Sequence, residues 1–203
     1  MQMKFINTFI TKMPVIFFIA LLFSGCASKA TKPEIVIAEN VELSKPVLLP
    51  EHLSEYKKAL GFMRAKSFGD AHKIFNTLLT IYPKLAGAYV NIAIIFQAES
   101  DDEQAQKNYS KALEINPNNV DALIQLAAYS QKQGQFKKVE KYLLTAEAVD
   151  KSNQTVQYNL AVLYELYLQQ FGEAIDHYEN YIALSSDEDV ETVKRWVMLL
   201  ERK

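Results

Sequence analysis

A 34-residue interval between like residues constrains the fold of this chain more than any other feature. The interval recurs in four series: Ala59, Ala93, Ala127 and Ala161; Ala71, Ala105 and Val139; Phe75, Tyr109 and Leu143; Leu78, Ala112 and Ala146. Pro83 and Pro117 stand the same distance apart. A repeat of this length is typical of paired amphipathic helices, which bury their apolar faces only by stacking on neighbouring pairs.

The composition agrees with a helical chain and excludes several classes of protein. The chain has six glycines and six prolines in 203 residues, and 49% of its residues are hydrophobic. These values exclude a disordered chain and favour helices over strands and turns. The net charge of -2 offers no basic field for nucleic acid, so we expect no nucleic-acid partner. The single cysteine, Cys26, excludes an intramolecular disulfide.

The repeated positions resemble the tetratricopeptide-repeat (TPR) family, whose pattern is W-x2-L-G-x2-Y…A-x3-F-x2-A…P. The best match, residues 86–119, has Tyr89, Ile92, Ala93, Phe96, Ala105, Tyr109, Ala112 and Pro117. The resemblance implies an all-α, right-handed TPR solenoid of about four helix-turn-helix repeats. The expected repeats are 52–85, 86–119, 120–153 and 154–188, and a capping helix is expected over 189–203.

Two local features refine this prediction. The fourth repeat starts in register at Ala161 and continues one residue late at Ala174, which indicates a one-residue insertion in the turn near Gln169–Gly172. The acidic run Asp101–Glu103 could suggest a cation site. It is better interpreted as the N-terminal cap of a helix, where carboxylates accept from unpaired backbone N–H groups.

The first 25 residues have the pattern of a secretory signal. Lys4 and Lys12 precede an apolar run from Met13 to Phe23, which is too short for a mature membrane span. Cys26 follows the small residues Ser24 and Gly25 and so resembles the cysteine of a bacterial lipobox. The resemblance implies removal of residues 1–25, acylation (palmitate) of Cys26 and a net charge near -4. The alternatives are a free cysteine beside an ordinary signal peptide, or an uncleaved anchor.

The residues after Cys26 predict where the protein is held. Ala27, rather than Asp, implies by resemblance to Gram-negative lipoproteins a lipid anchor at the periplasmic face of the outer membrane. Residues 26–51 form the lipidated N-terminus and an expected extended tether, which contains Pro33, Pro46 and Pro50.

The TPR resemblance also predicts a binding groove lined by the first helix of each repeat. The expected groove residues are Tyr56, Leu60, Met63, Val90, Asn91, Ile94, Gln97, Ile124, Ala128, Gln131, Tyr158, Val162 and Glu165. Their apolar stripe favours an apolar peptide or an amphipathic partner helix. Two alternatives stay open: a tight superhelix that closes over these residues, or filling by the chain's own Ile35–Ile37 or Val47–Leu49.

Catalytic chemistry finds little support in the sequence. His52, His72 and His177 stand apart from recurring ligand spacings, so we expect no catalytic residue, no metal and no cofactor. The function predicted is a non-catalytic adaptor. Lipidated TPR proteins resemble pilotins of pilus and secretion systems or adaptors of peptidoglycan enzymes. The alternatives are an accessory subunit of an envelope enzyme, or a self-associating scaffold whose C-terminal helix, with Trp196, forms a homodimer.

Overall fold

The computed structural model describes residues 47–185 and 190–202. The chain divides into two units, and all of the described residues lie in the second, Ile37–Lys203. Over these residues the regular structure is entirely helical, with nine α-helices, one π-helical turn and no strand. The predicted signal segment, Cys26 and residues 27–46 of the tether lie outside the described part. None of the described helices has the length and apolar character needed to cross a membrane.

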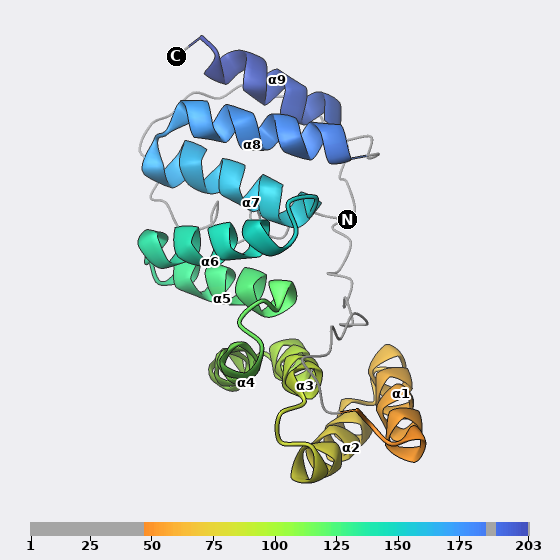
Figure 1. The fold of residues 1–203 in the computed structure, drawn as a ribbon. Helices are drawn as coiled ribbons and strands as arrows, with labels where there is room; N and C mark the ends of the chain where they lie inside the picture. Colours follow the sequence, from red (N-terminus) through yellow and green to blue (C-terminus); the bar gives the residue numbers. More distant parts are fainter. Residues whose placement is uncertain (1–46, 186–189, 203) are drawn as a thin grey trace, which may run out of the picture. The chain divides into compact units, whose positions relative to one another are not determined.

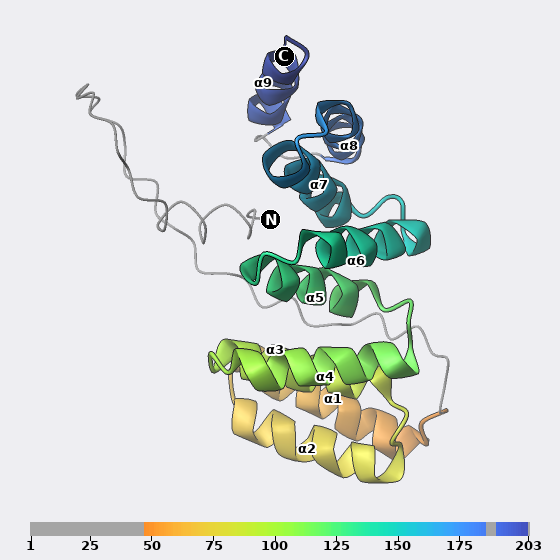
Figure 2. The same ribbon diagram turned by 90° about the vertical axis from the view of Figure 1, so that its left-hand side faces the viewer.

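The helices follow one another as antiparallel pairs, each pair packed on the next (Figures 1 and 2). Repeat 1 contains α1 (Pro50–Arg64) and α2 (Phe68–Ile81), and repeat 2 contains α3 (Ala86–Ala98) and α4 (Asp102–Ile115). Repeat 3 contains α5 (Val120–Lys132) and α6 (Phe136–Val149). Repeat 4 contains α7 (Gln154–Leu163), the π turn η1 (Tyr164–Leu168) and α8 (Phe171–Leu184), and α9 (Val190–Leu200) follows. The prediction of an all-α repeat solenoid is confirmed.

The residues that define the 34-residue interval form the core of the repeats. The four alanines at Ala59, Ala93, Ala127 and Ala161 are fully buried, because a larger side chain would hold the paired helices apart. The large side chains Phe75, Tyr109, Leu143 and Tyr178 occupy equivalent positions on the second helices and are at most 1% exposed. The 34-residue interval therefore marks two kinds of core position. The alanines of the first helices allow close helix contact, and the large side chains of the second helices fill the core.

The turn inside each of the first three repeats closes in the same way. Lys66, Ser100 and Gly134 have a positive φ and stand 34 residues apart. The following residue donates its backbone N–H to the carbonyl five positions earlier, as in Ser67 to Phe62 at 2.8 Å and Asp101 to Phe96 at 2.9 Å. These bonds satisfy carbonyls that the end of a helix would otherwise leave unpaired.

The turn in repeat 4 contains the extra residue. The residue with positive φ is Gln169, one position later than the interval predicts. Gln170 donates its N–H to the Tyr164 carbonyl at 2.9 Å, which is six positions earlier rather than five. The insertion therefore lies within the π turn before Gln169, and the predicted place near Gln169–Gly172 is slightly too late. A π turn accommodates one added residue without ending the helix.

Proline, a capping aspartate and apolar burial explain the positions of three helices in the stack. α1 starts at Pro50, two residues before the predicted boundary, because proline is well suited to the first turn of a helix. Asp101 caps α4, as predicted, by accepting a bond from the Gln104 N–H at 3.0 Å. At the other end, α9 buries Val193, Val197 and Leu200, and its Trp196 ring lies 6.0 Å from that of Tyr178.

Candidate interaction surface

Most of the predicted groove residues take part in packing. Nine of the thirteen are buried: Tyr56, Leu60, Met63, Val90, Asn91, Ile124, Gln131, Tyr158 and Val162. Ile94, Ala128 and Glu165 are half-buried, and Gln97 is exposed. These four are the predicted groove residues that a partner could reach without a shift of side chains. The apolar stripe seen in the sequence is therefore partly core.

Asn91 is the most deeply buried polar residue of the predicted groove. Its side-chain amide donates to the Tyr56 hydroxyl and to the Gly87 carbonyl, both at 2.8 Å, and so joins α1 to α3. Burial raises the pKa of Tyr56, while the hydrogen bond from Asn91 acts in the opposite direction. The Oδ1 atom of Asn91 accepts no hydrogen bond within the described part of the chain.

Gln97 and Glu165 occupy equivalent positions in repeats 2 and 4 and share a structural role. Gln97 accepts from the Tyr109 hydroxyl at 3.3 Å, and Glu165 accepts from the Tyr178 hydroxyl at 2.7 Å. Gln97 also donates to Gln125 at 3.1 Å, which connects α3 to α5. Burial raises the pKa of both tyrosines, so their hydroxyls remain donors at neutral pH. These two predicted groove residues therefore tie the first helix to the second.

A polar cluster at the junction of repeats 3 and 4 was missed by sequence reasoning. Gln157 on α7 is fully buried and donates to Glu147 on α6 at 3.0 Å and to the Lys151 carbonyl at 2.9 Å. Its carbonyl oxygen lies 2.8 Å from Nδ1 of His177 and accepts from Asn180 at 3.3 Å. The sequence contained one indication of this cluster. Gln157 is a polar amide at the repeat position that Tyr89 and Leu123 occupy in the earlier repeats.

His177 is the titratable group at the centre of this cluster. Its ring stacks on Tyr164 with centroids 5.5 Å apart, and its Nδ1 lies 3.7 Å from the Glu147 carboxylate. Burial lowers the pKa of His177, and the nearby Glu147, Asp176 and Glu173 oppose that shift. The Tyr164 hydroxyl donates to Glu140 at 3.1 Å and extends the cluster along α6.

The three histidines of the chain lie on three different helices, α1, α2 and α8. His52, His72 and His177 each pack against an aromatic ring, of Tyr82, Phe96 and Tyr164 respectively. In residues 47–185 and 190–202 no group of three or more His, Cys, Asp or Glu side chains could hold a metal ion.

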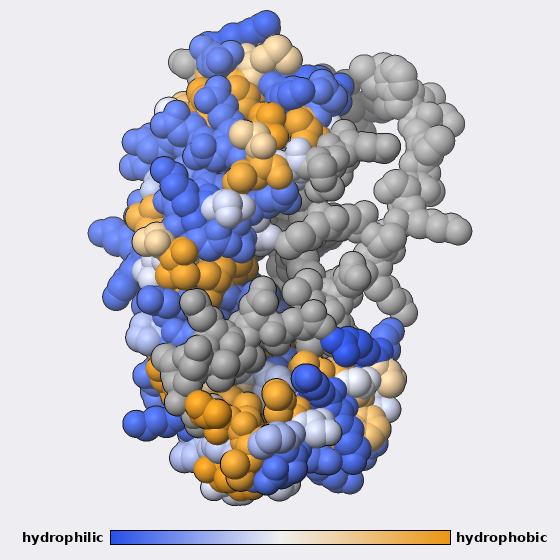
Figure 3. Space-filling view, turned by 45° about the vertical axis from the view of Figure 1, so that its right-hand side comes forward, coloured by the Kyte–Doolittle hydropathy of each residue, from blue (hydrophilic) through white to orange (hydrophobic). Residues whose placement is uncertain are grey.

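Apolar side chains reach the surface in separate patches divided by hydrophilic ones (Figure 3). The most exposed large apolar residues of the helices are Leu166 on η1 and Met198 and Leu199 on α9, which are 59%, 50% and 58% exposed. Near the start of α1, Val47 and Leu49 are also exposed, whereas Leu48 packs against the core of repeat 1.

The paired helices, the buried alanines and the repeated turns define a helical repeat solenoid. Comparison with known proteins places that solenoid in the tetratricopeptide-repeat fold. A family model described as the fifth ARM repeats domain of TT21 matches residues 87–186. Human tetratricopeptide repeat protein 6 is 34% identical over 98 residues, which cover 47% of this chain and 19% of that protein. The match thus spans about a fifth of that relative's length.

Solved structures support the same fold. The structure of Pseudomonas aeruginosa pilF aligns with a TM-score of 0.63 and 21% identity, covering 74% of this chain and 69% of that one. A thermophilic TPR protein of Thermus thermophilus aligns with a TM-score of 0.56 and 21% identity, covering 74% and 82%. A structure of MamA from AMB-1 gives 0.58 and 16% identity, covering 75% and 81%. At these levels of sequence identity, the structural similarity shows that the fold is shared.

Proposed function

We propose that this protein is a non-catalytic adaptor, held by a lipid on Cys26 at the periplasmic face of the outer membrane. Its first-helix face would bind an apolar peptide or amphipathic helix of a protein partner. The TPR fold supports the binding role, since stacked helix pairs create extended surfaces that other proteins occupy. The signal-like segment and the position of Cys26 in the sequence support the anchor.

The observation that carries the binding proposal is a pair of buried amides without full hydrogen bonding. Asn91 on α3 and Asn159 on α7 stand two repeats apart at the same position of the first helix. The Oδ1 of Asn91 and the Nδ2 of Asn159 have no hydrogen-bond partner among the described residues. Leaving a buried polar atom unpaired costs about 1–3 kcal/mol. The main chain of a bound peptide offers both the donor and the acceptor that these atoms lack.

The surroundings of these amides define the chemistry of the partner. Ile94 and Ala128 provide half-buried apolar surface, whereas Gln97 and Glu165 are already bonded to tyrosines. A partner with an apolar side chain beside an accessible main chain fits this mixture. Because the unpaired amide atoms are themselves covered, binding would require neighbouring side chains to move aside.

Binding by this face is tested most cleanly with an identified partner and a pair of matched variants. Ile94→Glu places a charge on α3, where the side chain is half-buried, and is expected to weaken partner affinity by about tenfold or more. Leu144→Glu introduces the same side chain on α6, where the residue is 40% exposed, and should leave affinity unchanged. Circular dichroism melting confirms that both variants are folded. Equal affinity of the two variants would rule the first-helix face out as the binding site.

The anchor is tested separately by membrane fractionation and acyl labelling. Cys26→Ala should abolish incorporation of a clickable palmitate analogue and shift the protein from the membrane to the soluble fraction. If Cys26→Ala left the same fraction of protein membrane-bound, the lipoprotein proposal would be wrong. That result would leave the groove proposal intact, since the two rest on different residues.

Exposed apolar side chains on α9 favour a second candidate, a scaffold that self-associates through its C-terminal helix. Met198 and Leu199 are adjacent and at least half exposed. Light scattering of the purified chain should then show a dimer that Met198→Asp with Leu199→Asp converts to a monomer. A monomeric wild-type chain at high concentration would exclude this candidate.

A further inference from the structure

The last helix of the described stack exposes side chains at positions that earlier repeats bury. Counting in 34-residue steps, with one more residue for the insertion in repeat 4, aligns Met198 on α9 with Ile95, Tyr129 and Leu163. Those three residues are at most 5% exposed, whereas Met198 is 50% exposed, and Leu199 beside it is 58% exposed. α9 thus has the register of a first helix, and no second helix among the described residues covers its apolar positions.

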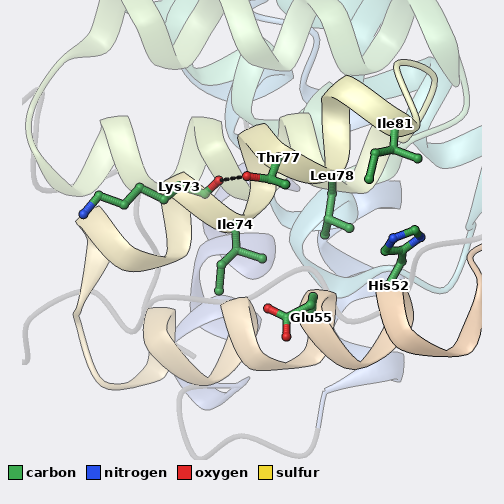
Figure 4. Close-up of a pocket in the computed structure, with 7 residues that line it drawn as sticks. All are labelled: His52, Glu55, Lys73, Ile74, Thr77, Leu78 and Ile81. Atoms are coloured by element: carbon green, nitrogen blue, oxygen red, sulfur yellow. Dashed lines mark hydrogen bonds between the residues drawn. The ribbon is translucent and has the colours of Figure 1, made fainter.

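The first helix pair is open as well, because a pocket lies between α1 and α2. The pocket has a volume of about 210 Å³, and Ile74, Leu78 and Ile81 of α2 form its apolar side. Figure 4 shows Ile74 and Leu78 projecting from α2 toward α1, with Glu55 and His52 on the opposite wall. The pocket therefore offers apolar surface beside a charged side chain of α1.

Two acidic residues of α1 stand where later repeats have apolar ones. Glu51 aligns with Leu85 of repeat 2, and Glu55 aligns with Leu123 of repeat 3. Both leucines are buried, whereas both glutamates are exposed. Lys73 also lines the pocket, but Figure 4 shows its ammonium group directed away from Glu55. This face of repeat 1 therefore combines an apolar pocket with an acidic edge.

Basic residues accompany the exposed apolar pair of α9. Lys194 and Arg195 are exposed, and each stands four positions before one member of that pair, so all four side chains share one side of the helix. Lys194 lies 2.7 Å from Glu191, and on α1 Glu55 lies 3.6 Å from Lys58. Exposed ion pairs of this kind contribute little stability, so both charges remain available to a partner. The α9 face is thus apolar and basic, whereas the α1–α2 face is apolar and acidic.

We propose that copies of this chain stack head to tail, with Met198 and Leu199 of one copy entering the α1–α2 pocket of the next. The two basic residues of α9 then face the two acidic residues of α1 in the neighbouring copy. Because the two surfaces differ, the contact is heterologous, and every assembly of this kind keeps one free pocket and one free α9. The proposal rests on the self-association through α9 proposed above and names the surface that receives this helix.

Light scattering of the full chain, combined with two complementary variants, tests the stacking. The wild-type mass should rise with concentration beyond that of a dimer. Ile81→Asp charges the pocket, and Met198→Asp with Leu199→Asp charges α9, so each of these two proteins alone should be monomeric. Their equimolar mixture should form a complex of two copies and grow no further, because it contains one intact pocket for each intact α9.

Val149→Asp is the matched control for the pocket variant. Val149 holds the position of Ile81 two repeats later and is 39% exposed, so this variant should assemble like the wild type. Circular dichroism melting verifies that every variant is folded. A monomeric wild-type chain would end both this proposal and the self-association on which it rests. A wild-type dimer that survives Ile81→Asp would keep the self-association and refute docking in the pocket, as would a mixture that stays monomeric.

A charge-reversal cycle tests which charges meet. Glu55→Lys and Lys194→Glu should each weaken assembly by about threefold, because each replaces an attraction between copies by a repulsion. A chain that carries both reversals should recover wild-type assembly. Lys107→Glu, an exposed reversal on α4, is the control and should have no effect. Losses that add in the double variant would place α9 away from the acidic edge of α1 and contradict the proposal.

Discussion

Repeats 2 and 4 hold the same kind of helix pair together with different chemistry. In repeat 2 the Tyr109 hydroxyl meets a neutral amide, Gln97, at 3.3 Å, whereas in repeat 4 the Tyr178 hydroxyl meets the carboxylate of Glu165 at 2.7 Å. Repeat 2 closes its turn after a regular helix, and repeat 4 does so after a π turn. In both repeats the second helix places its tyrosine at the same core position. The length of the first helix and the group that accepts the tyrosine hydrogen bond differ between the two repeats.

The largest expected effect is the cost of deleting one residue from the first helix of repeat 2, compared with deleting the extra residue of repeat 4. Deleting Ala98 from repeat 2 would rotate α4 by about 100° relative to α3 and turn Ala105 and Tyr109 out of the core. We expect it to cost at least about 3 kcal/mol in the free energy of unfolding. Deleting Leu166 restores the 34-residue spacing in repeat 4, and Leu166 is 59% exposed, so the cost should stay near 1 kcal/mol. Urea unfolding measures both, and equal costs would contradict this account of the π turn.

The second expected effect comes from the two tyrosine hydroxyls. Tyr178→Phe removes a short hydrogen bond to a carboxylate and should cost about 2 kcal/mol in the free energy of unfolding. Tyr109→Phe removes a longer bond to a neutral amide and should cost about 0.5 kcal/mol. The two variants keep the aromatic packing, so thermal and urea unfolding report the hydroxyl alone. A larger loss for Tyr109→Phe would reverse the comparison.

A smaller difference is expected at the N-caps of the second helices. Asp101 accepts the Gln104 N–H, whereas Gln170 makes no side-chain cap bond to α8. Asp101→Ala should therefore cost about 1 kcal/mol in unfolding free energy, and Gln170→Ala less than about 0.5 kcal/mol. Equal losses at the two positions would show that the cap bond does not stabilise α4.

The smallest expected effect is a pH dependence that arises at the junction of repeats 3 and 4. Burial lowers the pKa of His177 below its ordinary value of 6.5, so the unfolded chain binds a proton more readily than the folded one. Stability is therefore full above the ordinary value and falls as the pH drops through it. His177→Gln should reduce the change in melting temperature between pH 7.5 and pH 5.5. These two pH values lie roughly one unit above and below the ordinary pKa of histidine. An unchanged slope in His177→Gln would assign the dependence to another group.

The sequence predicted the parts of the structure that depend on periodicity. The helix pairs, the buried alanine series and the Asp101 cap follow from spacing and residue type, because close helix contact admits only small side chains at fixed positions. The place of the insertion could not be resolved, since a residue added to a π turn and one added to a loop leave the same downstream shift. The structure placed it before Gln169.

The candidate site was harder to predict for a related reason. Position within a first helix predicts which face a residue occupies, but not whether a neighbouring repeat covers that face. Val90 and Met63 are thus at most 1% exposed, although their positions predicted a groove. Gln157 is buried and His177 is half-buried, and their polar atoms pair across three helices. A single sequence does not show such pairing.

The central claim, that the first-helix face receives a protein partner, is tested most directly by site-specific photocrosslinking in cells expressing the full chain. A benzophenone amino acid at Gln97, which is exposed on α3, should give one dominant crosslinked protein. The same amino acid at Leu144, which is exposed on α6, should not trap that protein. Excess of a peptide from the crosslinked protein should compete with the Gln97 product. The same partner trapped with equal yield at both positions, or none at Gln97, would contradict the account.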